Sequence, residues 1–139
     1  MMRDCRYGSL VLLALVAGCG RGPEMAPVEG KVLFDGEPLP FGTVMFQPPS
    51  GQPAQAAIRP DGTFTMETFG RGRGAVVGLN RVRITCYESE APGADGSMSE
   101  EPAVGRMLIP ERYGQYATSG LEVEIQPGRN EPIIFELTR

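Results

Sequence analysis

The chain has 139 residues, 41% of them hydrophobic, and its 13 basic and 17 acidic residues give a formal net charge of −4 at pH 7. This length fits one domain with enough apolar residues for a core, and the charge balance shows no basic excess that would suggest a nucleic-acid partner. The chain contains no histidine, the commonest general base and metal ligand. We therefore predict no catalytic residues, no metal site and no cofactor.

The first 18 residues have the composition of an export signal. Arg3 and Arg6 form a short basic region, and residues 9–17 are almost entirely apolar. An apolar run of this length is too short to span a bilayer, which needs about 20 residues. Small residues follow it, as they do at signal cleavage sites. We predict a signal peptide over residues 1–18.

The signal ends in the sequence Leu-Val-Ala-Gly-Cys over residues 15–19. This segment resembles the lipobox of bacterial lipoproteins. The resemblance implies cleavage between Gly18 and Cys19, a diacylglycerol group on the Cys19 sulfur and acylation of the new amino terminus. Two or three acyl chains anchor a protein stably, whereas one binds only reversibly. The alternative is an ordinary signal peptide that is cut nearby, with Cys19 incidental.

Residues 19–26 are polar and rich in glycine, and we interpret them as a lipid-anchored tether. Such a tether reaches only about 20 Å when extended, at ~3 Å per residue. The domain that follows would therefore remain close to the membrane surface. The expected location is the bacterial cell envelope, on the periplasmic or cell-surface face, with the membrane as partner through the lipid on Cys19.

Apolar residues alternate with polar ones along most of residues 27–139, with a period of two that is typical of β-strands. Asp35-Gly36 and Asp61-Gly62 are turn pairs, and the second predicts a hairpin between the segments on either side of it. No helical apolar stripe is present. Seven short strands in such a length favour an all-β, seven-stranded Greek-key β-sandwich of the transthyretin-like or Ig-like kind. The predicted strands are 28–34, 42–47, 54–59, 63–68, 80–87, 121–126 and 133–138.

Two loops and two side-chain groups are candidate ligand sites. The glycine-rich loop 69–78 contains Arg71 and Arg73, while Arg81 and Arg83 share one face of a predicted strand; the second loop is 88–107. These arginines could form a cationic patch for anionic wall polymer or lipid headgroups. The alternative is a solvated surface.

Aromatic and sulfur-containing residues give weaker signals. Tyr113 and Tyr116 could stack on sugars, or they could dock the segment 107–120 on the sandwich. Cys86 is in phase with inward-facing residues, which predicts a buried and inert thiol. Glu122 and Glu124 lie on the polar exterior of their strand, so a pair of catalytic carboxylates is disfavoured.

Several segments resemble the carboxypeptidase-regulatory-like domain, a transthyretin-like β-sandwich of exported bacterial proteins. The resemblance implies that fold, an envelope setting and no enzymatic activity, because the domain is an appendage to the catalytic unit of carboxypeptidases. The matching segments are residues 28–32, 35–40, 44–46 and 61–64. Short lipoproteins built on one such domain also share residues 108–113 and 118–121.

Two functions remain open. The first is a non-enzymatic, lipid-anchored envelope protein that acts as a structural or interaction module, with an envelope protein as partner. The second is an accessory module that binds envelope polysaccharide or peptide through loops 69–78 and 88–107. A hydrolase would need a cluster of base and nucleophile that these residues do not assemble.

Overall fold

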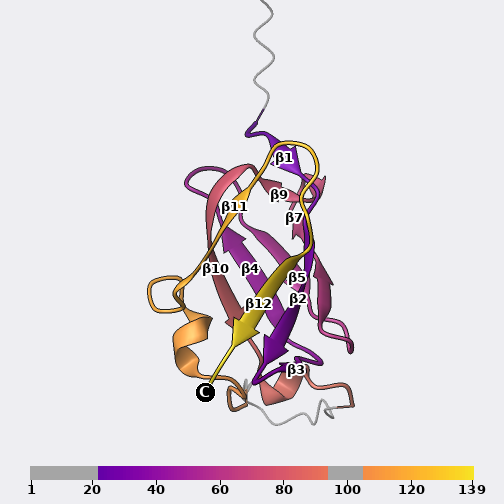
Figure 1. The fold of residues 1–139 in the computed structure, drawn as a ribbon, viewed down its shortest axis with the longest axis vertical. Helices are drawn as coiled ribbons and strands as arrows, with labels where there is room; N and C mark the ends of the chain where they lie inside the picture. The colour runs from indigo at the N-terminus through magenta and orange to yellow at the C-terminus, as the bar shows by residue number, and fades with distance from the viewer. Residues whose placement is uncertain (1–21, 94–104) are drawn as a thin grey trace, which may run out of the picture.

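The computed structural model describes residues 22–93 and 105–139 and is drawn in Figure 1. The predicted signal peptide and Cys19 lie outside the described residues, as does the middle of loop 88–107. No helix in the described part of the chain has the length and apolar character needed to cross a membrane.

The described residues form twelve β-strands and two short 3₁₀ turns. Most strands are brief, and glycine or proline separates many of them, as expected for a turn-rich all-β chain. In chain order the elements are β1 (Met25–Ala26), β2 (Glu29–Phe34), β3 (Glu37–Pro38), β4 (Thr43–Gln47), β5 (Ala54–Ala57), β6 (Thr63–Thr65), β7 (Glu67–Thr68), β8 (Gly72–Arg73), β9 (Ala75–Val76), β10 (Gly78–Thr85), η1 (Glu88–Glu90), η2 (Glu111–Gly114), β11 (Leu121–Ile125) and β12 (Ile133–Leu137).

The larger sheet has six antiparallel strands in the order β11-β10-β4-β5-β7-β8. Its longest strand, β10, lies between β11 and β4, so that Val82 lies opposite Leu121 on one side and Phe46 on the other. Alternate residues of β10 are buried, which is the pattern of a sheet with one face on the core.

The second sheet is built around β2. Strand β12 pairs with one edge of β2 in parallel, and β3 and β6 pair with the other edge in antiparallel fashion. The parallel pair joins the beginning of the domain to its end, since Gly30 lies opposite Ile133. A small third sheet pairs β1 with β9.

Apolar side chains from both main sheets meet in one core, which makes the domain sandwich-like. Phe46 of the larger sheet contacts Phe64 and Phe135 of the second sheet edge to face, with ring centroids 6.5 and 6.1 Å apart. Phe64 and Phe135 stack on one another at 6.0 Å. Each of the three rings is at most 5% exposed. Figure 1 shows β10, β4 and β5 on one side of this core and β12 and β2 on the other.

Each of the seven predicted strand ranges contains a strand, but the predicted hairpin at Asp61-Gly62 is wrong. The turn itself forms, because Gly62 N donates to Arg59 O at 2.8 Å and Arg59 N donates to Thr63 O at 2.9 Å. The flanking strands then separate, since β5 belongs to the larger sheet and β6 pairs with β2. The turn is therefore a corner between the sheets.

The predicted strand 63–68 is also divided. At Met66 the chain leaves β6 and enters β7, and Met66 is fully buried at this crossing. The backbone of Met66 forms hydrogen bonds with two other segments of the chain. Met66 N donates to Val28 O at 2.9 Å, and the Met66 carbonyl accepts from Gly74 N at 2.8 Å. An alternating pattern cannot reveal this crossing, because the same inward residues serve both sheets.

Two other boundaries differ from the prediction. The predicted tether 19–26 already contains β1, and Ala26 is 1% exposed, so the folded domain begins before residue 27. The predicted loop 69–78 contains β8 and β9 and the start of β10. Both differences involve the pair formed by β1 and β9. Each of these strands has only two residues, which is too short to show a period of apolar and polar residues.

Candidate functional site

The described chain nearest to the predicted anchor lies at the end of the molecule that carries β1 and β9. Gly18 and Cys19 are outside the described residues, and the first described residue is Gly22. A Cβ built on Gly22 would lie 3.3 Å from Cζ of Arg71, so the backbone there lies directly against this guanidinium. The tether therefore meets the domain beside the loop between β7 and β8.

The loop between β7 and β8 is a short, well-formed hairpin. Glu67 pairs with Arg73 and Thr68 with Gly72, and Arg71 N donates to Thr68 O at 3.0 Å. The buried Thr68 hydroxyl donates to Gly74 O at 2.9 Å and fixes the base of the hairpin. Arg71 and Arg73 are both exposed, and neither forms an ion pair within the described residues.

The four candidate arginines do not form one patch. Arg81 and Arg83 lie on β10, whereas Arg73 lies on β8 at the far edge of the same sheet. Strands β4, β5 and β7 lie between them, and four interstrand spacings of about 4.8 Å give a separation of roughly 19 Å. These residues are close together in the sequence, but the sequence does not show the strands that separate them in the structure.

Arg83 has local partners that account for its position. Its guanidinium carbon lies 5.3 Å from the centre of the Tyr116 ring, within the range of a cation–π contact. Its Nη2 donates to the Met45 sulfur at 2.9 Å. Arg81 is exposed and lies opposite Glu122 on β11. The Arg83 guanidinium thus lies over one face of the Tyr116 ring.

Tyr113 is buried and holds the C-terminal segment. Its hydroxyl accepts a hydrogen bond from Thr138 N at 3.0 Å and donates to Thr138 O at 3.2 Å, and Arg112 Nη2 also donates to it at 3.0 Å. Burial raises the pKa of the phenol, but the hydrogen bonds with Thr138 and Arg112 outweigh it, so the net pKa lies below the usual value of 10.0. This geometry supports the docking interpretation of Tyr113.

The two predicted ligand loops lie at opposite ends of β10, because 69–78 precedes this strand and 88–107 follows it. Eight residues of β10 span about 26 Å at 3.3 Å per residue. The described parts of the second loop fold back on the domain: Tyr87 bridges to Met107, and Arg106 forms an ion pair with Glu88 at 3.4 Å. The described residues of the two loops therefore do not line a common site.

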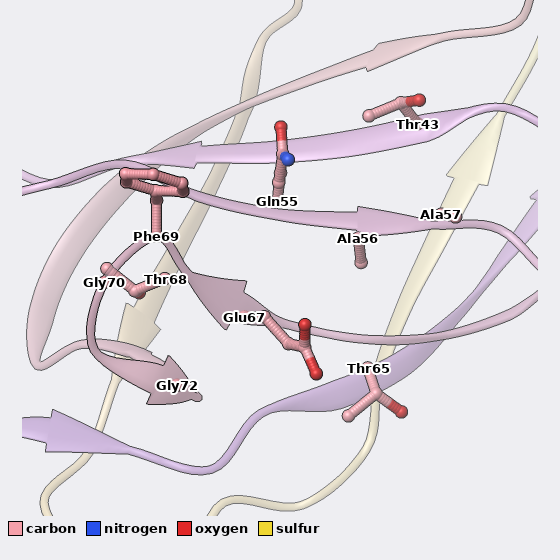
Figure 2. A pocket seen from close by; sticks show the side chains of 10 residues that line it. All are labelled: Thr43, Gln55, Ala56, Ala57, Thr65, Glu67, Thr68, Phe69, Gly70 and Gly72. Carbon is pink, nitrogen blue, oxygen red and sulfur yellow. The ribbon is translucent and has the colours of Figure 1, made fainter.

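A hollow of about 510 Å³ lies beside the β7–β8 hairpin. Figure 2 shows the Gln55 amide and the Phe69 ring at its hairpin end and Glu67 and Thr65 deeper along the strands. This mixture of amide, carboxylate, hydroxyl and aromatic groups suits a small polar ligand. Gln55, Glu67 and Phe69 belong to no motif in the sequence. Phe69 is marked there only as the first residue of the candidate loop 69–78. The lining residues are Thr43, Gln55, Ala56, Ala57, Thr65, Glu67, Thr68, Phe69, Gly70 and Gly72.

Three other expectations concern reactive groups. Cys86 is 1% exposed, which confirms its predicted burial, and Glu122 and Glu124 are exposed, as predicted. Over residues 22–93 and 105–139 no three histidine, cysteine, aspartate or glutamate side chains lie close enough to hold a metal ion.

Comparison with protein-family models, with curated proteins and with solved structures finds no match to this chain.

Proposed function

We propose that this chain is a lipid-anchored protein of the bacterial cell envelope that acts as a non-enzymatic structural or interaction module. The observation that carries the proposal is the sequence Leu-Val-Ala-Gly-Cys at residues 15–19, which follows a basic segment and a short apolar run. The partners of such a module are the membrane and another envelope component.

We further propose that the domain is a seven-stranded Greek-key sandwich of the carboxypeptidase-regulatory-like, transthyretin-like kind. The sandwich-like core and the turn at Asp35-Gly36 support it. Both residues of this turn have positive φ, 50° and 84°, and they join β2 to β3 in a two-residue hairpin.

The anchor is tested by intact mass spectrometry of the full chain extracted from bacterial membranes. We expect loss of residues 1–18 and an added mass of two or three acyl chains on Cys19. The Cys19→Ala variant should lose the acyl mass. Cys86→Ala is the matched control, because it removes the other cysteine of the mature chain and should leave the acyl mass unchanged.

The proposal fails if the wild-type chain is recovered from the cytosol with residues 1–18 still attached. It also fails if a mature chain is found without acyl mass, because this result supports the ordinary signal peptide instead.

The second candidate function is binding of an envelope polysaccharide or peptide, and the hollow beside the hairpin is the observation that favours it. Its lining comes from the hairpin and from β4, β5 and β6 but includes no described residue of loop 88–107. Titration with soluble peptidoglycan fragments, followed by NMR, tests this function. Binding should perturb the side-chain amide of Gln55, and Gln55→Ala should weaken it. Unchanged spectra at millimolar fragment would exclude this candidate.

A further inference from the structure

Phe69 is the most exposed large apolar side chain among the described residues, at 87%. It occupies the turn of the β7–β8 hairpin, and Gly70 beside it has a φ of +71°. The strand pairs below the turn and the buried Thr68–Gly74 hydrogen bond make the base of this hairpin well ordered. The ring is therefore carried by a turn with a defined base, and it is almost fully exposed to solvent.

The hairpin is physically joined to the start of the domain. Gly22 lies against the guanidinium of Arg71, as described above. Further along, a Cβ on Gly74 would lie only 2.4 Å from Ala26 O, so glycine is needed where β1 passes the base of the hairpin. The first described residues therefore lie along the hairpin from its base to its tip. Figure 1 shows β1, β9 and β7 together at one end of the molecule.

The distance from this hairpin to the proposed anchor is short. Gly22 follows Cys19 by three residues, and even a fully extended chain covers only about 11 Å over that interval. Cys19 must therefore lie within about 11 Å of the backbone that contacts Arg71. If Cys19 is acylated at the bilayer surface, this span is short enough for the hairpin tip to reach the lipid headgroups.

Phe69 and Arg71 in the turn, and Arg73 in the strand that follows it, match the chemistry found at that depth. Aromatic rings partition into the interface between acyl chains and headgroups. Arginine binds phosphate through paired N–H groups, and Arg71 and Arg73 have no ion-pair partner in the described part of the chain. One aromatic residue followed by two such guanidinium groups is thus complementary to a phospholipid surface.

We propose that the β7–β8 hairpin is a second membrane contact, in which Phe69 enters the headgroup region of the bilayer and Arg71 and Arg73 bind lipid phosphates. This inference rests on the proposed lipid anchor. It adds that the domain does not swing freely on its tether but stands on the membrane with β1, β9 and the hairpin toward the lipid. The opposite end, with η1 and η2, then faces away from the membrane.

The test uses the absence of tryptophan from the chain. Phe69→Trp introduces a single tryptophan, which can be excited selectively, at a position that is 87% exposed. Leu108→Trp is the matched control, because Leu108 is 39% exposed and its backbone N donates to Cys86 O, beyond the far end of β10. Each full-length variant is purified from membranes, its acyl mass is confirmed, and it is reconstituted into vesicles with or without brominated acyl chains.

We expect brominated lipid to quench the fluorescence of the Phe69→Trp variant strongly and to leave that of the Leu108→Trp variant unquenched. The emission of Phe69→Trp should also lie at shorter wavelength in vesicles than in urea. In vesicles rich in phosphatidylglycerol, adding Arg71→Gln or Arg73→Gln to Phe69→Trp should lower the ratio of inserted to free indole about fivefold. In zwitterionic vesicles of phosphatidylcholine the same added substitutions should have a smaller effect.

The inference is overturned if acylated Phe69→Trp protein is quenched no more than the Leu108→Trp control. It is also overturned if the indole of Phe69→Trp responds to soluble peptidoglycan fragments but not to lipid, since the ring would then serve the hollow. A chain without acyl mass contradicts the proposed anchor itself, and the mass spectrum reports this before any fluorescence is measured. The two failures are therefore distinguishable.

Discussion

The Cys86 thiol lies just beyond the end of β10 and is almost completely buried. Burial raises its pKa from 9.0 to about 11, and the nearby Glu90 carboxylate adds to the rise. The thiolate is the reactive form, so this shift suppresses reaction at ordinary pH. The thiol is consequently protected both by its chemistry and by lack of access.

This gives a prediction for alkylation of the mature chain. At about pH 8, a two-unit rise in pKa lowers the thiolate fraction about a hundredfold relative to an unfolded cysteine. We expect iodoacetamide to label Cys86 at least about a hundredfold more slowly in native protein than in urea, as measured by mass spectrometry. Because the pKa of the folded form is raised, the thiol favours folding below pH 9.0, and this contribution falls as the pH rises toward 11. Native labelling at the urea rate would contradict the burial.

The sequence predicts the buried position of Cys86 but does not show which apolar side chain has the largest exposed fraction. Phe69 belongs to no motif, and the sequence predicts only that it begins the glycine-rich candidate loop 69–78. Its exposure follows from the pairing of β7 with β8, which is decided by bonds to Thr68 and Gly74. The sequence therefore could not identify the side chains of the candidate site, because it does not show which strands pair.

Among the elements, β2 depends most closely on a glycine. A Cβ on Gly30 would lie 2.1 Å from Ile133 O and 2.6 Å from Cζ of Phe64. Backbone of the partner strand cannot move aside without breaking the parallel β2–β12 ladder. The glycine lets β12 and the Phe64 ring approach β2 from two directions.

We predict that Gly30→Ala destabilises the domain by about 3 kcal/mol or more, because the added methyl overpacks the junction of β2, β12 and Phe64. Gly128→Ala is the control: its φ is +83° and nothing lies within 4 Å, so only backbone strain of about 1–2 kcal/mol is expected. Urea denaturation of a chain expressed from Gly20 onwards measures both. Equal losses would show that the junction is not tightly packed.

The alternation of apolar and polar residues located all seven main strands, because each strand has one face on the core. It could not assign partners: the turn at Asp61-Gly62 satisfies every local rule for a hairpin, yet β5 and β6 belong to different sheets. The strand β1 was missed because two residues carry no period. Pairing is decided by long-range packing, which a local pattern does not encode.

For the molecule as a whole, the three rings of Phe46, Phe64 and Phe135 join the two main sheets. Phe46 is fully buried, whereas Phe69 is almost fully exposed. The same substitution at these two positions therefore separates packing from surface chemistry.

We predict that Phe46→Ala costs about 3–5 kcal/mol of unfolding free energy, through lost apolar burial and the cavity that remains. Phe69→Ala should change it by less than about 0.5 kcal/mol in the lipid-free chain, as for other exposed positions. Urea denaturation monitored by circular dichroism measures both variants. A large loss at Phe69 would mean that its ring packs on the domain and is not free for another surface.

The parallel ladder between β2 and β12 has a consequence for the order in which the domain can form. Strand β2 starts at Glu29, but its partner runs to Leu137. The second sheet cannot be completed until the residues up to Leu137 are available to pair. If the chain is exported as proposed, this strand order would keep the sheet incomplete, and the polypeptide able to pass extended through a secretion channel, until Leu137 has been made.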